Sequence, residues 1–169
     1  MTKKKHKWLP YACRVAGIGL LVIVIGLCLP ITLPRVFGFR VYEVISGSME
    51  PEIPVGSVLY VKPTDLKSIE EGDVIAYQNV DEVVAHRVVY NRSGLGEFVT
   101  KGDANNVEDR EPVSYDAVVG KVELHLPWFG MAMSLYATWV GKLYLLLTAG
   151  CGFMLCMLAN RLEEEQANR

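Results

Sequence analysis

Two long apolar stretches flank a middle segment in which apolar and polar positions alternate. The first stretch, Val15 to Pro34, holds no charged residue, and Lys142 is the only charge in the second, Leu126 to Asn160. About 20 apolar residues suffice to cross a bilayer as an α-helix, and Trp and Tyr favour its surface. The parts predicted outside the middle domain are membrane helices at residues 15–34 and 137–159, and an interfacial segment at 126–136.

A basic tail at residues 1–14 precedes the first apolar stretch. Lys and Arg flanking a membrane helix favour the cytoplasmic side, and two spans return the tail at 160–169 to that side. The first stretch is followed by no pair of small residues at the spacing of a cleavage site, which favours an uncleaved anchor over a removable signal peptide. The pattern predicts a multi-pass protein of the plasma membrane, with a domain at 35–125 on the extracytoplasmic face.

The middle segment, Arg40 to Glu123, contains short runs rich in Val, Ile and Tyr, each bounded by Gly, Pro, Asn or Asp. Such runs are typical of strands and turns, and no stretch here has the 3.6-residue period of a helix. Strands are expected at Gly56–Pro63, Gly72–Gln78, Glu82–Tyr90, Glu97–Asp103 and Ala117–Leu124, with a hairpin connection at Asn91–Glu97. The fold class expected is therefore mainly β: a small twisted sheet or partly closed barrel with two flanking transmembrane helices.

Composition excludes several classes of function for this domain. From Arg40 to Glu123 there are sixteen acidic and eight basic residues, a balance that disfavours nucleic-acid binding. All four cysteines, at positions 13, 28, 151 and 156, lie in or beside the apolar stretches. The domain can therefore hold neither a disulfide nor a thiol nucleophile. It also lacks metal-ligand spacing and a phosphate loop, so no cofactor is expected.

The stretch "SGSMEP", Ser46 to Pro51, places two serines in a turn near the start of this domain. Gly and Pro punctuate turns, and serine hydroxyls often only satisfy nearby backbone groups. Alternatively, Ser48 is a nucleophile held on an exposed bend. A serine hydroxyl is inert at neutral pH, so this interpretation requires a base elsewhere in the chain.

Among the three histidines, only His86 lies within the expected sheet; His6 is in the basic tail and His125 lies where the chain returns to the membrane. A single histidine on an apolar strand is more often structural than catalytic, and function must be argued from a site. Histidine can nevertheless accept a serine proton at neutral pH when a third group orients the imidazole. Asp103 and Asp109, in one loop, are candidates for that group, and spacing alone does not choose between them or exclude a solvated turn.

Four stretches occur in this order: "SGSMEP", "GDVIAY", "HRVV" and "KGDANNVEDR". This series resembles the motifs of type I signal peptidases, and specifically the endoplasmic-reticulum and archaeal branch that sporulating Gram-positive bacteria also contain. The common bacterial enzymes and the related self-cleaving repressors have a lysine base where this chain has His86. The residues formally available as a lysine base instead are Lys62, Lys67, Lys101 and Lys121.

The resemblance implies a membrane-bound serine endopeptidase that removes signal peptides from exported preproteins without a cofactor. It makes Ser48 the nucleophile, His86 the general base, Asp109 the partner of the histidine and Asp103 a second required carboxylate. The backbone N–H of Ser48 and the hydroxyl of Ser46 are candidates for the oxyanion hole. The expected partners are signal peptides and the lipid bilayer, with accessory membrane subunits left open.

A different class of function is a non-catalytic, membrane-anchored binding or assembly subunit with the same fold. Loss of a catalytic residue would mark such a subunit. The chain retains Ser48, His86, Asp103 and Asp109, which argues against this alternative.

Overall fold

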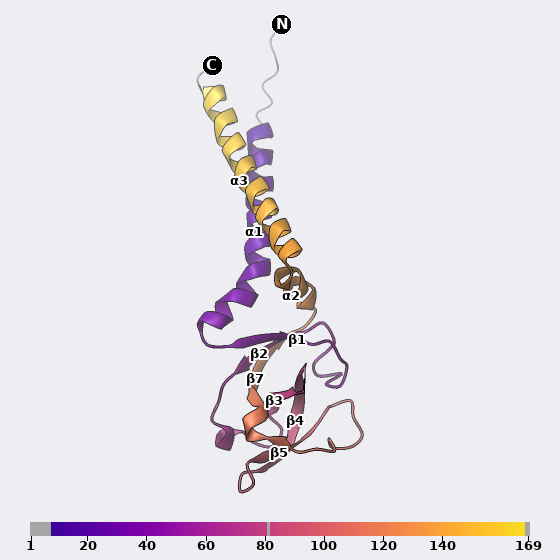
Figure 1. Ribbon diagram of the computed structural model, residues 1–169. Helices are drawn as coiled ribbons and strands as arrows, with labels where there is room; N and C mark the ends of the chain where they lie inside the picture. The colour runs from indigo at the N-terminus through magenta and orange to yellow at the C-terminus, as the bar shows by residue number, and fades with distance from the viewer. Residues whose placement is uncertain (1–7, 81, 168–169) are drawn as a thin grey trace. The chain divides into compact units, whose positions relative to one another are not determined.

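The computed structural model describes residues 8–80 and 82–167. The chain forms two compact units. The first contains the described residues up to Pro30 and those from Leu135 onward, and the second contains Ile31–Ser134. Figure 1 labels the elements of both.

The described residues form three α-helices: α1 (Trp8–Val36), α2 (Gly130–Ala137) and α3 (Trp139–Ala167). Within the first unit α1 and α3 lie side by side (Figure 1), joined by an Arg14–Glu163 ion pair of 2.7 Å. They approach closely where a Cβ on Gly17 would lie 2.7 Å from the carbonyl oxygen of Gly152. Small residues permit such close helix packing in membranes.

Both α1 and α3 are long and apolar enough to cross a membrane by length and composition. The stretch predicted to cross at 15–34 lies inside α1. The helix α3 begins just after the start of the stretch predicted at 137–159 and continues to Ala167.

The second unit is built on one antiparallel sheet of seven strands (Figure 1). The strands are β1 (Arg40–Glu43), β2 (Val58–Lys62), β3 (Val74–Asn79), β4 (Glu82–Arg92), β5 (Glu97–Lys101), β6 (Val113–Ser114) and β7 (Val118–Leu126). All five strands expected from the sequence are confirmed, as is the hairpin between β4 and β5. The sequence pattern missed β1 and β6.

The expectation of a partly closed barrel is wrong, because the sheet is open. Its strand order is β1-β2-β7-β3-β4-β5-β6, so β1 and β6 are its edges. A barrel requires the last strand to pair with the first, whereas β1 pairs with β2 and β6 pairs with β5. Register shifts bend the sheet locally, one of them between Val88 and Tyr90 in β4.

The side chains of β3 alternate between two apolar clusters. Ile75 and Tyr77 of β3 belong to a cluster that includes the fully buried Phe98. Ala76, between them in sequence, belongs to the other cluster, which also contains Met49. Because successive strand residues point to opposite faces, the sheet has a packed layer on both sides.

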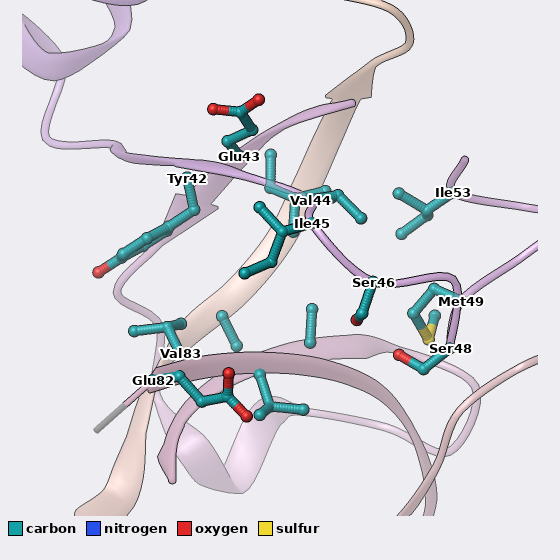
Figure 2. A pocket seen from close by; sticks show the side chains of 14 residues that line it. Tyr42, Glu43, Val44, Ile45, Ser46, Ser48, Met49, Ile53, Glu82 and Val83 are labelled. Carbon is teal, nitrogen blue, oxygen red and sulfur yellow. The ribbon is translucent and has the colours of Figure 1, made fainter. Parts of the chain in front are cut away.

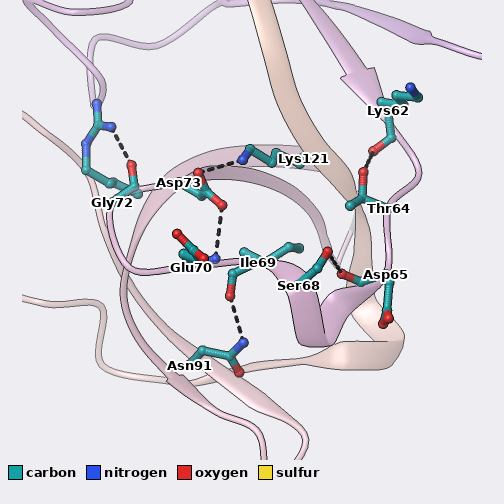
Figure 3. Close-up of polar contacts among 11 residues, drawn as sticks. Lys62, Thr64, Asp65, Ser68, Ile69, Glu70, Gly72, Asp73, Asn91 and Lys121 are labelled. Atoms are coloured by element: carbon teal, nitrogen blue, oxygen red, sulfur yellow. Dashed lines mark hydrogen bonds and ion pairs between the residues drawn. The ribbon is translucent and has the colours of Figure 1, made fainter.

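The connection between β2 and β3 includes a short 3-10 helix, Leu66–Ser68, and is tied to the sheet by polar contacts (Figure 3). Asn91 Nδ2 donates to the carbonyl oxygen of Ile69 at 2.8 Å. The Lys121 ammonium lies 2.7 Å from the Asp73 carboxylate, which also accepts from the N–H of Glu70 at 3.0 Å. These contacts fix the start of β3.

Candidate active site

Ser48 lies in a turn whose next residue is anchored in the core. Met49 is 2% exposed, and its carbonyl oxygen accepts from the N–H of Ile53 at 2.8 Å. Ser48 itself is half-buried and Ser46 is exposed. The buried methionine therefore holds the turn against the sheet while the serines remain accessible.

His86 lies on β4 opposite Ile75 of β3 and is 8% exposed. Its Nδ1 atom lies 2.6 Å from Asp109 Oδ2. A carboxylate in this position favours the tautomer with a proton on Nδ1, which leaves Nε2 free to accept a proton. The edge of the Tyr77 ring faces the imidazole, with the ring centroids 6.2 Å apart.

Asp109 is held by β5. Its backbone N–H donates to the carbonyl oxygen of Thr100 at 2.9 Å, and the Thr100 hydroxyl donates to Asp109 Oδ2 at 2.7 Å. Burial, together with the negative charge of Asp109, raises the pKa of Tyr77. The tyrosine hydroxyl beside the carboxylate therefore stays protonated at neutral pH.

Asp103 does not contact His86 but pairs with the next residue, Arg87. The Arg87 guanidinium donates to both oxygens of the Asp103 carboxylate, at 2.8 and 2.6 Å, and to the carbonyl oxygen of Gly72 at 2.8 Å. The hydrogen bonds to Asp103 raise the pKa of Arg87 further above its ordinary value. The two aspartates of the loop thus bind neighbouring residues of β4.

The aspartate loop is also fastened to the serine turn. The N–H of Ala104 donates to the carbonyl oxygen of Ser48 at 2.9 Å. A Cβ on Gly102 would lie 2.6 Å from that same oxygen and 3.1 Å from His86 Nε2. Glycine at 102 therefore lets the loop, the serine turn and the imidazole approach one another.

The structure brings Ser48 and His86 to one cavity of about 630 Å³, which Ser46 and Asp109 also line. Among the described residues no hydrogen bond joins the Ser48 hydroxyl to His86. Catalytic hydrogen bonds are often long in an unliganded enzyme and tighten when substrate binds. In the described part of the chain, neither the backbone N–H of Ser48 nor the hydroxyl of Ser46 makes a hydrogen bond. Both groups can therefore donate to an oxyanion.

A second cavity, of about 200 Å³, begins at Ser48 and extends along β4. Figure 2 shows Tyr42 to Met49 on one side of it and Glu82 and Val83 of β4 across from them. Its lining also includes Ala76 and Ala85, which are small, and mostly apolar neighbours. Most of the lining is apolar, and Glu43 and Glu82 also belong to it.

Half of β4 has a free edge beside these cavities. Residues 82–87 pair with β3 on one side, but β5 pairs only with Arg87 and the residues after it. Within the described chain, the other edge from Glu82 to Ala85 therefore has no partner strand. Such an edge can receive an extended peptide by backbone hydrogen bonding.

No protein-family model matches the chain. The chain is 44% identical over 90 residues to signal peptidase I W of Bacillus subtilis (strain 168), covering 50% of this chain and 47% of that protein. It is 32% identical over 100 residues to the signal peptidase complex catalytic subunit SEC11C of Homo sapiens, covering 52% of each.

A third relative is also a signal peptidase subunit. The signal peptidase complex catalytic subunit SEC11 of Fusarium vanettenii is 31% identical over 99 residues, which cover 52% of this chain and 58% of that protein. The chain thus spans about half the length of the curated relatives it matches. By this similarity, the chain is related to the type I signal peptidases of the endoplasmic-reticulum and Gram-positive type.

Proposed function

We propose that the protein is a membrane-bound serine endopeptidase that removes N-terminal signal peptides from exported preproteins. Ser48 is the nucleophile, His86 the general base and Asp109 the group that orients the imidazole. The proposal is carried by one observation: His86 Nδ1 lies on Asp109, while His86 and Ser48 line one cavity at the end of a free strand edge. The similarity to signal peptidases supports the same activity.

The free edge of β4 also accounts for the substrate class. Side chains of an added strand alternate between the two faces of the sheet. The small cavity lies on the Ala76 and Ala85 face, so every second residue of a bound peptide points into it. Signal-peptide cleavage sites carry small residues at alternate positions. The spacing of small residues in the substrate therefore matches the period of the strand it would form.

The reaction proceeds by acyl transfer. The Ser48 hydroxyl attacks the scissile carbonyl carbon while His86 Nε2 accepts its proton. The Ser48 N–H and the Ser46 hydroxyl stabilise the oxyanion. The imidazolium then protonates the leaving amine, which releases the mature protein. Water, activated by the same imidazole, hydrolyses the acyl-enzyme. Asp103 acts indirectly, because its ion pair with Arg87 holds the loop that carries Asp109.

The two apolar helices support the proposal that this chemistry takes place at a membrane. Residues 15–34 of α1 and 137–159, mostly in α3, are the proposed crossing segments, with the β domain on the extracytoplasmic face of the plasma membrane. A site tethered there meets the cleavage site of a signal peptide whose apolar part lies in the bilayer.

Cleavage of one preprotein in reconstituted membranes tests the proposal. Wild type is compared with Ser48→Ala, His86→Ala and His86→Lys, and both alanine variants are expected to abolish processing. Wild-type activity in His86→Ala would remove histidine as the base and direct attention to the lysines. No cleavage by wild type of any preprotein tested would favour the non-catalytic binding subunit.

A further inference from the structure

Thr100 makes two contacts to Asp109 from a fully buried position on β5. It is 0% exposed and lies opposite Val88 of β4. Its carbonyl oxygen holds the Asp109 backbone and its hydroxyl holds the Asp109 carboxylate. The first contact survives any side-chain substitution at Thr100, so the two roles can be separated by experiment.

The Thr100 hydroxyl donates to the same carboxylate oxygen of Asp109 that contacts His86. Asp109 Oδ2 accepts from Thr100 Oγ1 at 2.7 Å and lies 2.6 Å from His86 Nδ1. Rotation of the carboxylate about its terminal torsion, which is soft in aspartate, would break both contacts together. A hydroxyl bound to this oxygen therefore opposes the motion that would release the imidazole.

Threonine is well suited to this task. Its β-branched side chain is restricted in χ1, so the hydroxyl is held in one direction inside the sheet. Charge-assisted hydrogen bonds to a carboxylate are stronger than neutral ones. Here the bond is shielded from water, because the Asp109 side chain is only 20% exposed and that of His86 10%.

We propose that Thr100 is a positioning residue whose hydroxyl fixes the orientation of the Asp109 carboxylate, and through it the Nδ1-protonated tautomer of His86. The inference rests on the proposed peptidase function for its catalytic consequence, but not for its structural one. Thr100 touches neither substrate nor the reacting atoms.

The kinetic test compares Thr100→Val with Thr100→Ser in the full chain, using the preprotein cleavage assay. Valine keeps the shape and removes the hydroxyl, whereas serine keeps the hydroxyl. Thr100→Val is expected to lower kcat about 10–100-fold, as loss of other groups that orient a functional imidazole does, with little change in KM. Thr100→Ser is expected to stay near wild type.

A spectroscopic readout needs no turnover. The Nδ1 proton of His86 is followed by NMR in the detergent-solubilised, histidine-labelled protein, and its signal is assigned by its loss in His86→Ala. Thr100→Val is expected to shift or broaden this signal, and Thr100→Ser to preserve it. Tyr115→Phe is the matched control, because it also removes a hydroxyl, one that donates to Asn91 of β4 and, within the described chain, bonds to neither His86 nor Asp109.

Wild-type kcat and an unchanged His86 signal in Thr100→Val would overturn the inference. Equal losses in Thr100→Ser and Thr100→Val would overturn it too, because packing of the methyl group and not the hydroxyl would then be responsible. If the signal responds as expected while wild type cleaves no preprotein, the positioning stands and the proposed function fails.

Discussion

His86 and Arg87 are consecutive residues of β4 that bind two carboxylates of one loop from opposite faces of the sheet. His86 contacts Asp109 and Arg87 contacts Asp103. Because adjacent strand residues point in opposite directions, the loop must wrap the edge of β4 to reach both. The Arg87–Asp103 ion pair on one face therefore helps to hold the Asp109 carboxylate, which contacts His86 on the other face.

The Arg87–Asp103 pair is expected to stabilise the loop measurably. Both side chains are partly buried and the contact is bidentate, a geometry that lysine cannot reproduce. A double-mutant cycle with Arg87→Ala and Asp103→Ala should give a coupling free energy of about 0.5–3 kcal/mol, measured by chemical unfolding in detergent. Arg87→Lys should recover only part of it.

The Arg92–Glu97 ion pair, which joins β4 to β5, provides the control for that cycle. It is a single contact of 3.0 Å, with the arginine side chain 49% exposed. Exposed pairs contribute at most about 1 kcal/mol. A coupling as large for Arg92–Glu97 as for Arg87–Asp103 would show that bidentate geometry and burial are not what stabilise the loop.

Gly102→Ala is expected to damage both stability and activity. The added Cβ would lie 2.6 Å from the Ser48 carbonyl oxygen, a backbone atom that cannot move without shifting the serine turn. Overpacking of this kind costs about 1–3 kcal/mol. Melting temperature and cleavage rate should both fall. Gly94→Ala is the control, since a Cβ there meets nothing within 4 Å, and equal effects of the two substitutions would contradict the steric explanation.

The Asp73–Lys121 pair predicts a specific pH dependence of stability. Partial burial alone would raise the pKa of Asp73, but the hydrogen bonds from Lys121 and Glu70 lower it overall. The hydrogen bond to Asp73 raises the pKa of Lys121. The stabilisation is therefore present between the unfolded pKa values of about 3.9 and 10.4. It is lost as pH falls below that range through the folded pKa of Asp73, or rises above it through that of Lys121.

Unfolding free energies measured from pH 5 to pH 2 at low salt test the predicted loss of stability in acid. In Asp73→Asn the acid-side loss should be smaller than in wild type, by about 1 kcal/mol or less because the pair is partly exposed. Asp116→Asn, at an exposed carboxylate that has no ion pair in the described chain, should leave the acid-side loss unchanged. An equal change in both variants would rule out the pair as its source.

Ala85→Val should make the protein more selective for small residues in the substrate. Ala85 lines the small cavity beside Ser48, so a larger side chain there leaves less room for the substrate. Discrimination by one or two methyl groups in an apolar pocket reaches about tenfold or more. The ratio of kcat/KM for glycine over alanine before the scissile bond should rise. Ala117→Val, which narrows the larger cavity instead, should leave this ratio unchanged.

The central strands could be predicted from the sequence because β3 and β4 are rich in Val, Ile and Tyr. β1 and β6 could not, since four and two residues are too few to show a pattern. The openness of the sheet depends on which edges pair, and local sequence does not encode that. The barrel expectation failed for this reason.

The candidate site, too, could be predicted only in part from the sequence. Ser48 and His86 were proposed from residue type and order, because a nucleophile needs a base and the sheet expected from the sequence held one histidine. The structure adds a second, because His125 lies on β7. Thr100 and Tyr77 gave no signal, since both are ordinary strand residues. Their contacts with Asp109 and His86 exist only once β3, β4 and β5 are paired. Arg87 was visible beside His86, but its bond to Asp103 depends on the course of the loop.

The register of β4 has a chemical consequence. A slip of one residue against β3 would turn every side chain of the strand to the other face. Arg87 would then point toward Asp109, and His86 would point away from the serine. The pairing of His86 with Ile75 and the irregularity between Val88 and Tyr90 hold the strand against such a slip. Backbone pairing thus decides whether the imidazole or the guanidinium faces Asp109.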